Sequence, residues 1–190
     1  MSAPDNRNMV IFPERIDGKI ARLERPFPIY GRGAPEAFDT WYADSPDGRY
    51  WGNQQLVLGS ESVPFANNKI GPGAPPVRTE RGWLTVIHAV YKDDNRDLGG
   101  WGANPWTKRY VAGLVLLDLD EPWRVIGMCE EPILEPEEVY TYEVEGYRGS
   151  VIFPGGLVAE DDGTVKIYYG AADTVECLAT AHIDDLLALL

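Results

Sequence analysis

The stretch FPGGLVAEDDGTVKIYYG, residues 153–170, contains the pattern that decides the fold. A proline-marked strand is followed by an acidic connection, by the turn residues Asp-Gly and by an apolar strand. A similar order, with a short acidic or basic connection and a turn glycine before the apolar strand, occurs at 12–20, FPERIDGKI, and at 75–84, PPVRTERGWL. Antiparallel units repeated in this way are typical of a β-propeller, and a β-sandwich with similar hairpins is the alternative.

Outward from these stretches, turn signals alternate with short runs of β-branched and aromatic residues. These runs predict strands at 9–12, 19–25, 41–43, 55–58, 83–91, 110–118, 151–153, 157–159, 165–170 and 177–182. Only residues 183–190 have helical spacing of apolar residues, behind Asp184 and Asp185 in the first turn. The fold class is therefore all-β with a short C-terminal helix.

We assign residues 1–190 to a single partial propeller domain with blade units at 8–52, 55–127 and 133–182. Propellers close with about four to eight blades, so about three blades make an incomplete propeller. Its uncovered strand edges would promote aggregation. Either missing N-terminal blades complete the ring, or copies of the chain associate as a homo-oligomer.

The charge of the chain excludes several classes of partner. Its 190 residues contain 30 Asp and Glu against 17 Lys and Arg, a formal net charge of −13, which disfavours nucleic acids and anionic membranes. The two cysteines, Cys129 and Cys177, are too few for a disulfide framework and lack the spacing of metal ligands, so no metal site is expected. Without an apolar run of about 18 residues or a signal peptide, we expect a cytoplasmic protein.

Three ordered motifs carry a resemblance to a known family. Residues 8–26, 69–88 and 153–174 resemble the β-mannoside phosphorylases of glycoside hydrolase family 130, and the similarity runs from about Arg7 to the C-terminal leucines. It implies a five-bladed β-propeller of which this chain is the C-terminal part. It also implies that a mannosyl saccharide and inorganic phosphate are the substrates, that α-mannose 1-phosphate is formed with inversion, and that no cofactor is needed.

A phosphate nucleophile requires cations and amide donors that converge on one point. The resemblance places Arg7, Asn8, Arg25, Lys69 and His88 around this anion. The strand pattern agrees, because the face of 19–25 that carries Arg25 is otherwise apolar. The alternative is that Arg25 pairs with Glu24 or Glu14 at the surface and that His88 is an ordinary core histidine.

For the sugar, the resemblance implies that Asp173 hydrogen-bonds the mannosyl ring and that Phe153 forms part of the wall of its subsite. The alternative for Asp173 is an Asx-turn or a cap at the end of a strand. The segment 92–110 contains Trp101, Trp106 and Tyr110, which could stack on an acceptor sugar or serve in core packing or an oligomer contact.

The family's general acid is an aspartate upstream of the matching segment. Asp5 lies too close to Arg7 to be that residue, so we expect no catalytic residue in this chain. Two classes of function stay open: a phosphorylase, or a hydrolase of the same family, whose phosphate-binding side is present here, and a non-catalytic or self-assembling propeller fragment.

Overall fold

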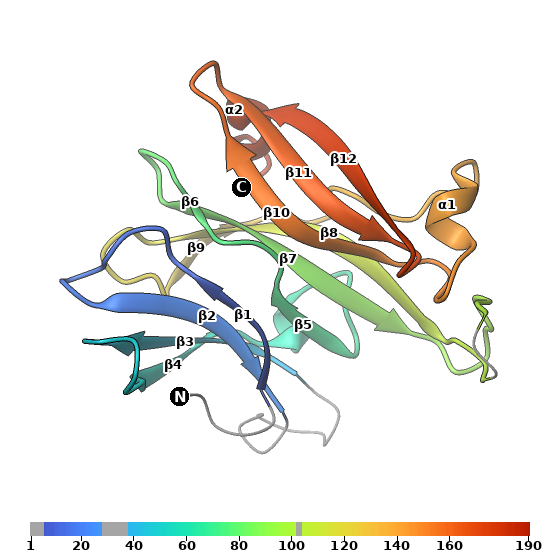
Figure 1. Ribbon diagram of the computed structural model, residues 1–190, viewed down its shortest axis with the longest axis horizontal. Coiled ribbons are helices and arrows are strands. Elements are labelled where there is room, and N and C mark those ends of the chain that lie inside the picture. Colours follow the sequence, from blue (N-terminus) through green and yellow to red (C-terminus); the bar gives the residue numbers. More distant parts are fainter. Residues whose placement is uncertain (1–5, 28–37, 102–103) are drawn as a thin grey trace.

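The computed structural model describes residues 6–27, 38–101 and 104–190, which form three antiparallel sheets (Figure 1). The first sheet, in the order β1-β2-β3-β4, contains β1 (Asn6–Ile11), β2 (Ile20–Pro26), β3 (Thr40–Ser45) and β4 (Gly52–Leu58). The central sheet contains β5 (Lys69–Pro72), β7 (Trp83–Lys92), β8 (Lys108–Leu117) and β9 (Val125–Met128), with β6 (Val77–Arg78) paired to β7. The third sheet contains β10 (Ile152–Ala159), β11 (Thr164–Ala171) and β12 (Val175–His182).

Three short helical segments complete the described chain. They are a 3-10 turn, η2 (Ser60–Ser62), and two α-helices, α1 (Thr141–Val144) and α2 (Ile183–Leu187). The prediction of a nearly all-β chain is therefore confirmed, and the predicted C-terminal helix is present but ends at Leu187. None of the helices in the described part of the chain is long and apolar enough to cross a membrane.

The turn glycine of each repeat lies at a hairpin turn, one in each sheet. Gly18, Gly82 and Gly163 have φ values of 72°, 153° and 84°, a region that favours glycine. Each glycine precedes a strand, β2, β7 or β11, that continues into the core. The repeat in the sequence thus corresponds to a repeated hairpin in the structure.

The structure corrects the strand predictions in three respects. The short strands β5, β6 and β9 and the helix α1 were not predicted, because Pro, Gly and short length remove the periodic signal. Residues 151–153 and 157–159 belong to one strand, β10, whose register shifts between Pro154 and Gly156. A proline is tolerated in a strand at such a bulge. Strand β4 pairs with β3, so residues 55–58 lie in the first sheet rather than with the second unit.

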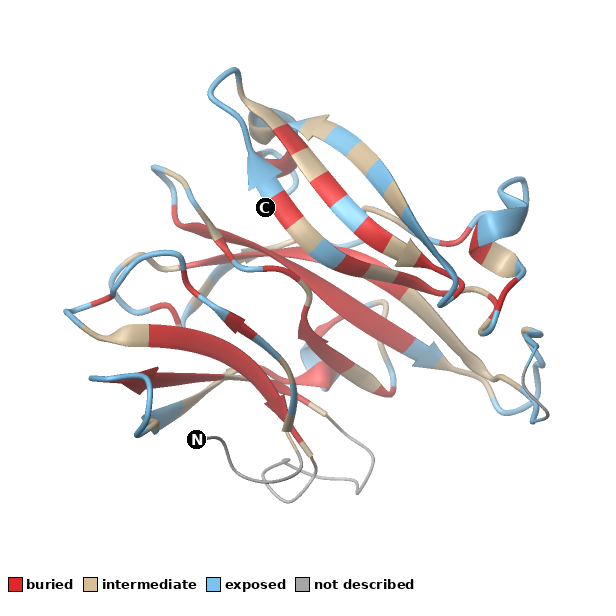
Figure 2. Ribbon diagram, viewed as in Figure 1, coloured by how far each residue is buried: buried red, intermediate tan, exposed pale blue. Residues whose placement is uncertain are grey.

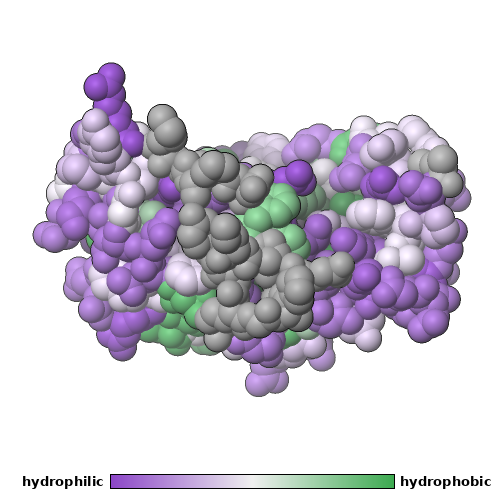
Figure 3. Space-filling view, turned by 90° about the horizontal axis from the view of Figure 1, so that it is seen from below, coloured by the Kyte–Doolittle hydropathy of each residue, from purple (hydrophilic) through white to green (hydrophobic). Residues whose placement is uncertain are grey.

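The central sheet lies between the other two and is buried on both faces (Figures 1 and 2). Alternate residues of β7 explain this arrangement, because successive side chains of a strand point to opposite faces. Ile87 and Ala89 pack in a cluster with the first sheet, whereas Leu84 and Val86 pack in a cluster with the third. The two clusters hold the three sheets in a fixed arrangement, which positions the residues at their common edge. The face of the molecule in Figure 3 is largely hydrophilic, with some hydrophobic areas near its middle.

Candidate functional site

The candidate site lies where the three sheets meet. Two isolated bridges join them there, Phe38 with Lys69 and Tyr110 with Val151. The Ile70 amide donates to the Phe38 carbonyl at 3.0 Å, and the Tyr110 amide donates to the Ser150 carbonyl at 3.1 Å. These bonds bring the ends of β5, β8 and β10 together around a cavity of about 190 Å³.

The cavity is lined by residues from all three sheets and their connections. The lining residues are Arg7, Asn8, Arg25, Lys69, Trp106, Tyr110, Val151, Phe153 and Asp173. The structure therefore gathers six of the seven predicted site residues in one place. The seventh, His88, is fully buried and contacts four of the lining residues, which are Asn8, Arg25, Tyr110 and Phe153.

A β-bulge in β1 presents Arg7 and Asn8 to the cavity. The register between β1 and β2 shifts between Arg7 and Val10, and Asn8 has φ = 56°. Asparagine tolerates this left-handed conformation better than most residues, and bulges commonly redirect side chains beside functional sites. Arg7 also lies directly opposite Arg25 across the strand pair, an unfavourable placement for two like charges.

Arg25 is buried and lacks a carboxylate partner among the described residues. It is 4% exposed, and its guanidinium lies 5.1 Å from the centre of the Phe38 ring. Burial lowers the pKa of Arg25, and the Arg7 guanidinium acts in the same direction. A buried cation without a counter-charge is costly, so the arrangement favours binding of an anion.

Both carboxylates that could have paired with Arg25 are engaged elsewhere. Glu24 forms a buried ion pair with Arg22 at 2.5 Å on the other face of β2. Glu14 lies 3.9 Å from Arg78 at the surface. The surface-pairing alternative for Arg25 is therefore wrong.

His88 contacts residues on the cationic side of the cavity. Its Nε2 lies 3.4 Å from Arg25 Nη1 and 3.4 Å from Asn8 Nδ2. Because an arginine can only donate, Nε2 accepts and the imidazole is neutral. Burial, followed by the charges of Arg25 and Lys69, lowers the pKa of His88 to about 3. His88 is thus a buried core residue, as the alternative held, and it also orients the two donors above it.

Gly71 of β5 makes room for the His88 ring. The two residues are register partners across β5 and β7. A Cβ at position 71 would lie 2.5 Å from His88 Cε1 and 3.2 Å from Arg25 Cδ. The glycine is therefore required by the close approach of the ring to the backbone.

Lys69 adds a cation whose charge depends on pH. Burial lowers its pKa to about 8, and the cations Lys108, Arg25 and Arg7 contribute to the shift. Its ammonium lies 5.1 Å from the centre of the Tyr110 ring. At neutral pH the site therefore presents three cations, Arg7, Arg25 and Lys69. The described residues contain no cluster of His, Cys, Asp or Glu that could hold a metal ion.

Asp173 also lines the cavity and lies in the tight turn between β11 and β12. Ala172 and Asp173 have φ values of 49° and 52°, and the Thr174 amide closes the turn on the Ala171 carbonyl at 3.0 Å. The backbone turns here, but the Asp173 carboxylate accepts none of the backbone hydrogen bonds found among the described residues that an Asx-turn or a cap would require, and its side chain lines the cavity. Burial raises the pKa of Asp173, an effect that the nearby Arg148 opposes.

Aromatic rings form the wall between the cations and Asp173. Phe153 stacks on His88 with a centroid separation of 4.7 Å, and Trp106 stacks on Tyr110 at 6.0 Å. Burial raises the pKa of Tyr110 to about 12, so its hydroxyl stays protonated. Trp101, by contrast, is 71% exposed and does not line the cavity. Part of the 92–110 segment, residues 102–103, and Asp5 lie outside the described residues.

Two contributors were not predicted from the sequence. Val151 lines the cavity, and the Arg148 guanidinium lies 4.7 Å from the centre of the Trp106 ring. The Arg148 amide also donates to the Ala172 carbonyl at 3.1 Å, which holds the Asp173 turn. The only available signal was their position just before the motif that begins at Phe153.

Residues 4–190 match the family whose description is beta-1,4-mannooligosaccharide phosphorylase. The chain belongs to glycoside hydrolase family 130. A relative in this family, the beta-1,2-mannobiose phosphorylase of Listeria innocua, is 36% identical over 97% of this chain and 46% of its own length. The beta-1,4-mannooligosaccharide phosphorylase of Ruminococcus albus is 36% identical over 97% of this chain and 50% of its own length.

A solved structure from this family has the same fold as the chain. The solved beta-1,2-mannobiose phosphorylase of Listeria innocua, in complex with beta-1,2-mannobiose, superimposes with a TM-score of 0.81 at 35% identity, over 99% of this chain and 47% of that one. This family 130 chain thus spans about half the length of the curated relatives it matches.

Proposed function

We propose that this chain forms the phosphate-binding side, and part of the mannosyl-binding side, of an inverting β-mannoside phosphorylase. The observation that carries the proposal is the group of Arg7, Arg25 and Lys69 around one cavity, without a carboxylate partner among the described residues. Phosphate would supply the missing negative charge and would relieve the repulsion between Arg7 and Arg25.

In this proposal each side of the cavity has a separate role. The cations and the Asn8 amide hold phosphate in line with the anomeric carbon, and phosphate acts as the nucleophile without a general base. The carboxylate of Asp173 accepts hydrogen bonds from hydroxyls of the mannosyl ring, which Phe153 contacts from the side. Inorganic phosphate is the co-substrate, and no cofactor is required.

The acid that protonates the leaving oxygen is proposed to come from an upstream aspartate outside the matching segment. The relatives are about twice as long as this chain, which supports a five-bladed propeller of which these three sheets are a part. A hydrolase of the same family is the second candidate, but water as a nucleophile requires no set of cations.

The test has two arms. Titration calorimetry of the 190-residue chain with inorganic phosphate is expected to show binding, and Arg25→Gln is expected to abolish it. The matched control is Arg124→Gln, which removes a surface arginine that pairs with Glu121. An unaltered phosphate affinity in Arg25→Gln would contradict the proposal.

The second arm measures phosphate release from α-mannose 1-phosphate with mannose, glucose, N-acetylglucosamine or mannobiose as acceptors. We expect the chain alone to release none, because the proposed acid lies upstream. Release by the chain alone would show that an acid is present in it or is supplied by self-assembly.

A further inference from the structure

A second cavity, of about 480 Å³, lies at the other end of the first sheet. It is formed by the β1–β2 turn, by β3 and β4, and by the β8–β9 turn, and it shares no residue with the site above. Its volume falls within the range of about 300–1,000 Å³ that is typical of small-molecule sites. Nothing in the proposed reaction uses these residues.

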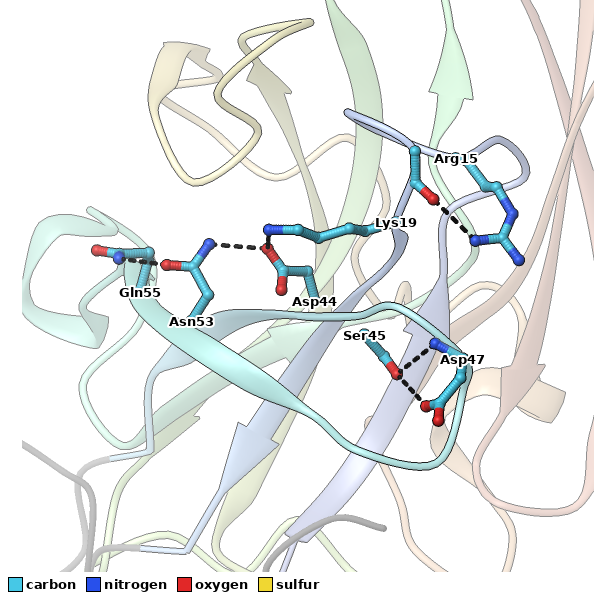
Figure 4. Close-up of polar contacts among 8 residues, drawn as sticks. Arg15, Lys19, Asp44, Ser45, Asp47, Asn53 and Gln55 are labelled. Atoms are coloured by element: carbon cyan, nitrogen blue, oxygen red, sulfur yellow. Dashed lines mark hydrogen bonds and ion pairs between the residues drawn. The ribbon is translucent and has the colours of Figure 1, made fainter.

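A fixed polar cluster forms one wall of this cavity (Figure 4). Asp44 Oδ2 accepts from Lys19 Nζ at 3.2 Å and from Asn53 Nδ2 at 2.8 Å. Gln55 Nε2 donates to Asn53 Oδ1 at 3.2 Å, which orients the amide. Asp44 is only 8% exposed, whereas the Lys19 side chain is 41% exposed and can reach a ligand.

Two aromatic residues form another wall. Trp123 is half-buried and lies edge-on to Tyr42, with ring centroids 5.2 Å apart. Tyr42 is 2% exposed and lines the cavity. Burial, followed by the charges of Asp44 and Asp17, raises its pKa to about 12, so the phenol remains a donor. The phenol of Tyr42 can therefore donate a hydrogen bond to an oxygen of a ligand in the cavity.

The charges around the cavity restrict the class of ligand. Asp17, Asp44 and Asp120 oppose a single cation, Lys19, so an anion such as phosphate is repelled. No cluster in the described residues could hold a metal ion. A neutral molecule with many hydroxyls, which both donate and accept, fits the mixed lining, and the Trp123 ring offers a surface for stacking.

We propose that this second cavity binds a neutral saccharide, separately from the phosphate site. The inference does not depend on catalysis by the chain, because it uses a different set of residues. It predicts that, in the absence of phosphate, a neutral sugar binds at two sites, the cavity lined by Asp173 and this second cavity.

The experiment is a saturation-transfer NMR and calorimetric titration of the full chain with β-1,4-mannobiose. Asn53→Ala and Asp120→Asn are expected to weaken the second binding event by about tenfold and to leave phosphate affinity unchanged. Asp173→Asn is expected to leave the second event intact. Asp161→Asn, an exposed carboxylate in the β10–β11 turn, is the matched control.

Three results would overturn the proposal. The first is a single sugar-binding event that Asp173→Asn abolishes. The second is sugar binding that is insensitive to Asn53→Ala and Asp120→Asn while circular dichroism shows both variants folded. The third is preferential binding of glucosamine over glucose at pH 6, since that would identify an organic cation as the ligand.

Discussion

Arg25 is the residue on which the electrostatics of the proposed phosphate site depend. It is 4% exposed, lies opposite Arg7 and contacts the neutral imidazole of His88. None of these contacts neutralises its charge. The chain thus tolerates a buried cation that weakens the free protein, an arrangement expected where an anion is bound.

Arg25→Gln is therefore expected to separate stability from binding. The unfolding free energy without phosphate should change by less than about 1 kcal/mol, because the lost contacts are offset by relief of charge repulsion. Saturating phosphate, at 100 times the Kd, should stabilise the unaltered chain by about 2.7 kcal/mol and the variant not at all. Thermal or urea unfolding with and without phosphate measures both quantities. A strongly destabilised variant that phosphate still stabilises would contradict this account.

If phosphate binds as proposed, Lys69 should give its affinity a pH dependence. Because its pKa in the free chain is about 8, phosphate affinity should fall as the pH rises from 8 to 10, where phosphate itself remains dianionic. Lys69→Arg should bind with a flat profile over the same range, since arginine stays charged. Calorimetry at pH 7, 8, 9 and 10 tests this difference.

Without phosphate, the lowered pKa of Lys69 makes the unfolding free energy rise with pH, whereas it makes phosphate affinity fall. Folding lowers its pKa from about 10.4 to about 8, so the unfolded chain binds more protons in this range. The contribution of Lys69 to the unfolding free energy should therefore increase with pH between 8 and 10. Lys69→Met should lack this increase, whereas Lys166→Met, which removes a half-buried lysine that pairs with Glu160, should retain it.

The pairing of β5 with β7 is the element on which the site is built. Strand β5 has only four residues, Lys69–Pro72, yet it supplies Lys69, carries Gly71 opposite His88 and contacts the first sheet. The backbone of β5 must approach the imidazole closely, which a side chain at position 71 would prevent. The close approach of the β5 backbone to His88 therefore determines where the side chains of Lys69 and Arg25 lie.

Gly71→Ala should test this close approach. The added methyl would collide with the His88 ring and displace Arg25, with an expected loss of about 2 kcal/mol in stability and at least tenfold in phosphate affinity. Gly155→Ala is the control, because a Cβ there meets nothing within 4 Å. Chemical denaturation and calorimetry on both variants measure the outcome. Equal behaviour of the two would show that the ring can move without cost.

The molecule as a whole exposes the edge strand and the outer face of its third sheet, although its composition is strongly acidic. Within the described chain, β12 pairs only with β11. On the outer face of this sheet Val158, Tyr168 and Leu178 are 43%, 38% and 51% exposed. An unpaired edge beside apolar side chains promotes association, whereas the net charge of −13 opposes it through repulsion.

We therefore expect association of the chain to increase with salt. Light scattering should give a mass near 21.1 kDa at low ionic strength and a larger mass in about 0.5 M NaCl, where the Debye length falls to a few ångströms. Leu178→Lys should restore the monomer at high salt, and Lys166→Met should not. A monomer under all conditions would contradict self-association through this sheet.

The sequence by itself determined the local structure and the identity of the family. Turn glycines and alternating apolar residues were sufficient for most strands, because hairpins form between neighbouring segments. The motifs around Arg7, Arg25, Lys69 and Asp173 identified most of the residues that line the site, and family membership is confirmed. Short segments such as β5 and β9 carry too few residues for a periodic signal, and they were missed.

Only the tertiary structure decided which distant segments meet. The bridges of Phe38 with Lys69 and of Tyr110 with Val151 join residues 31 and 41 positions apart, which no local pattern encodes. The same applies to the second cavity, where the β1–β2 turn meets Trp123 of the β8–β9 turn. The physical reason is that strands form from local preferences, whereas the packing of whole sheets through two buried clusters determines which of their ends become neighbours.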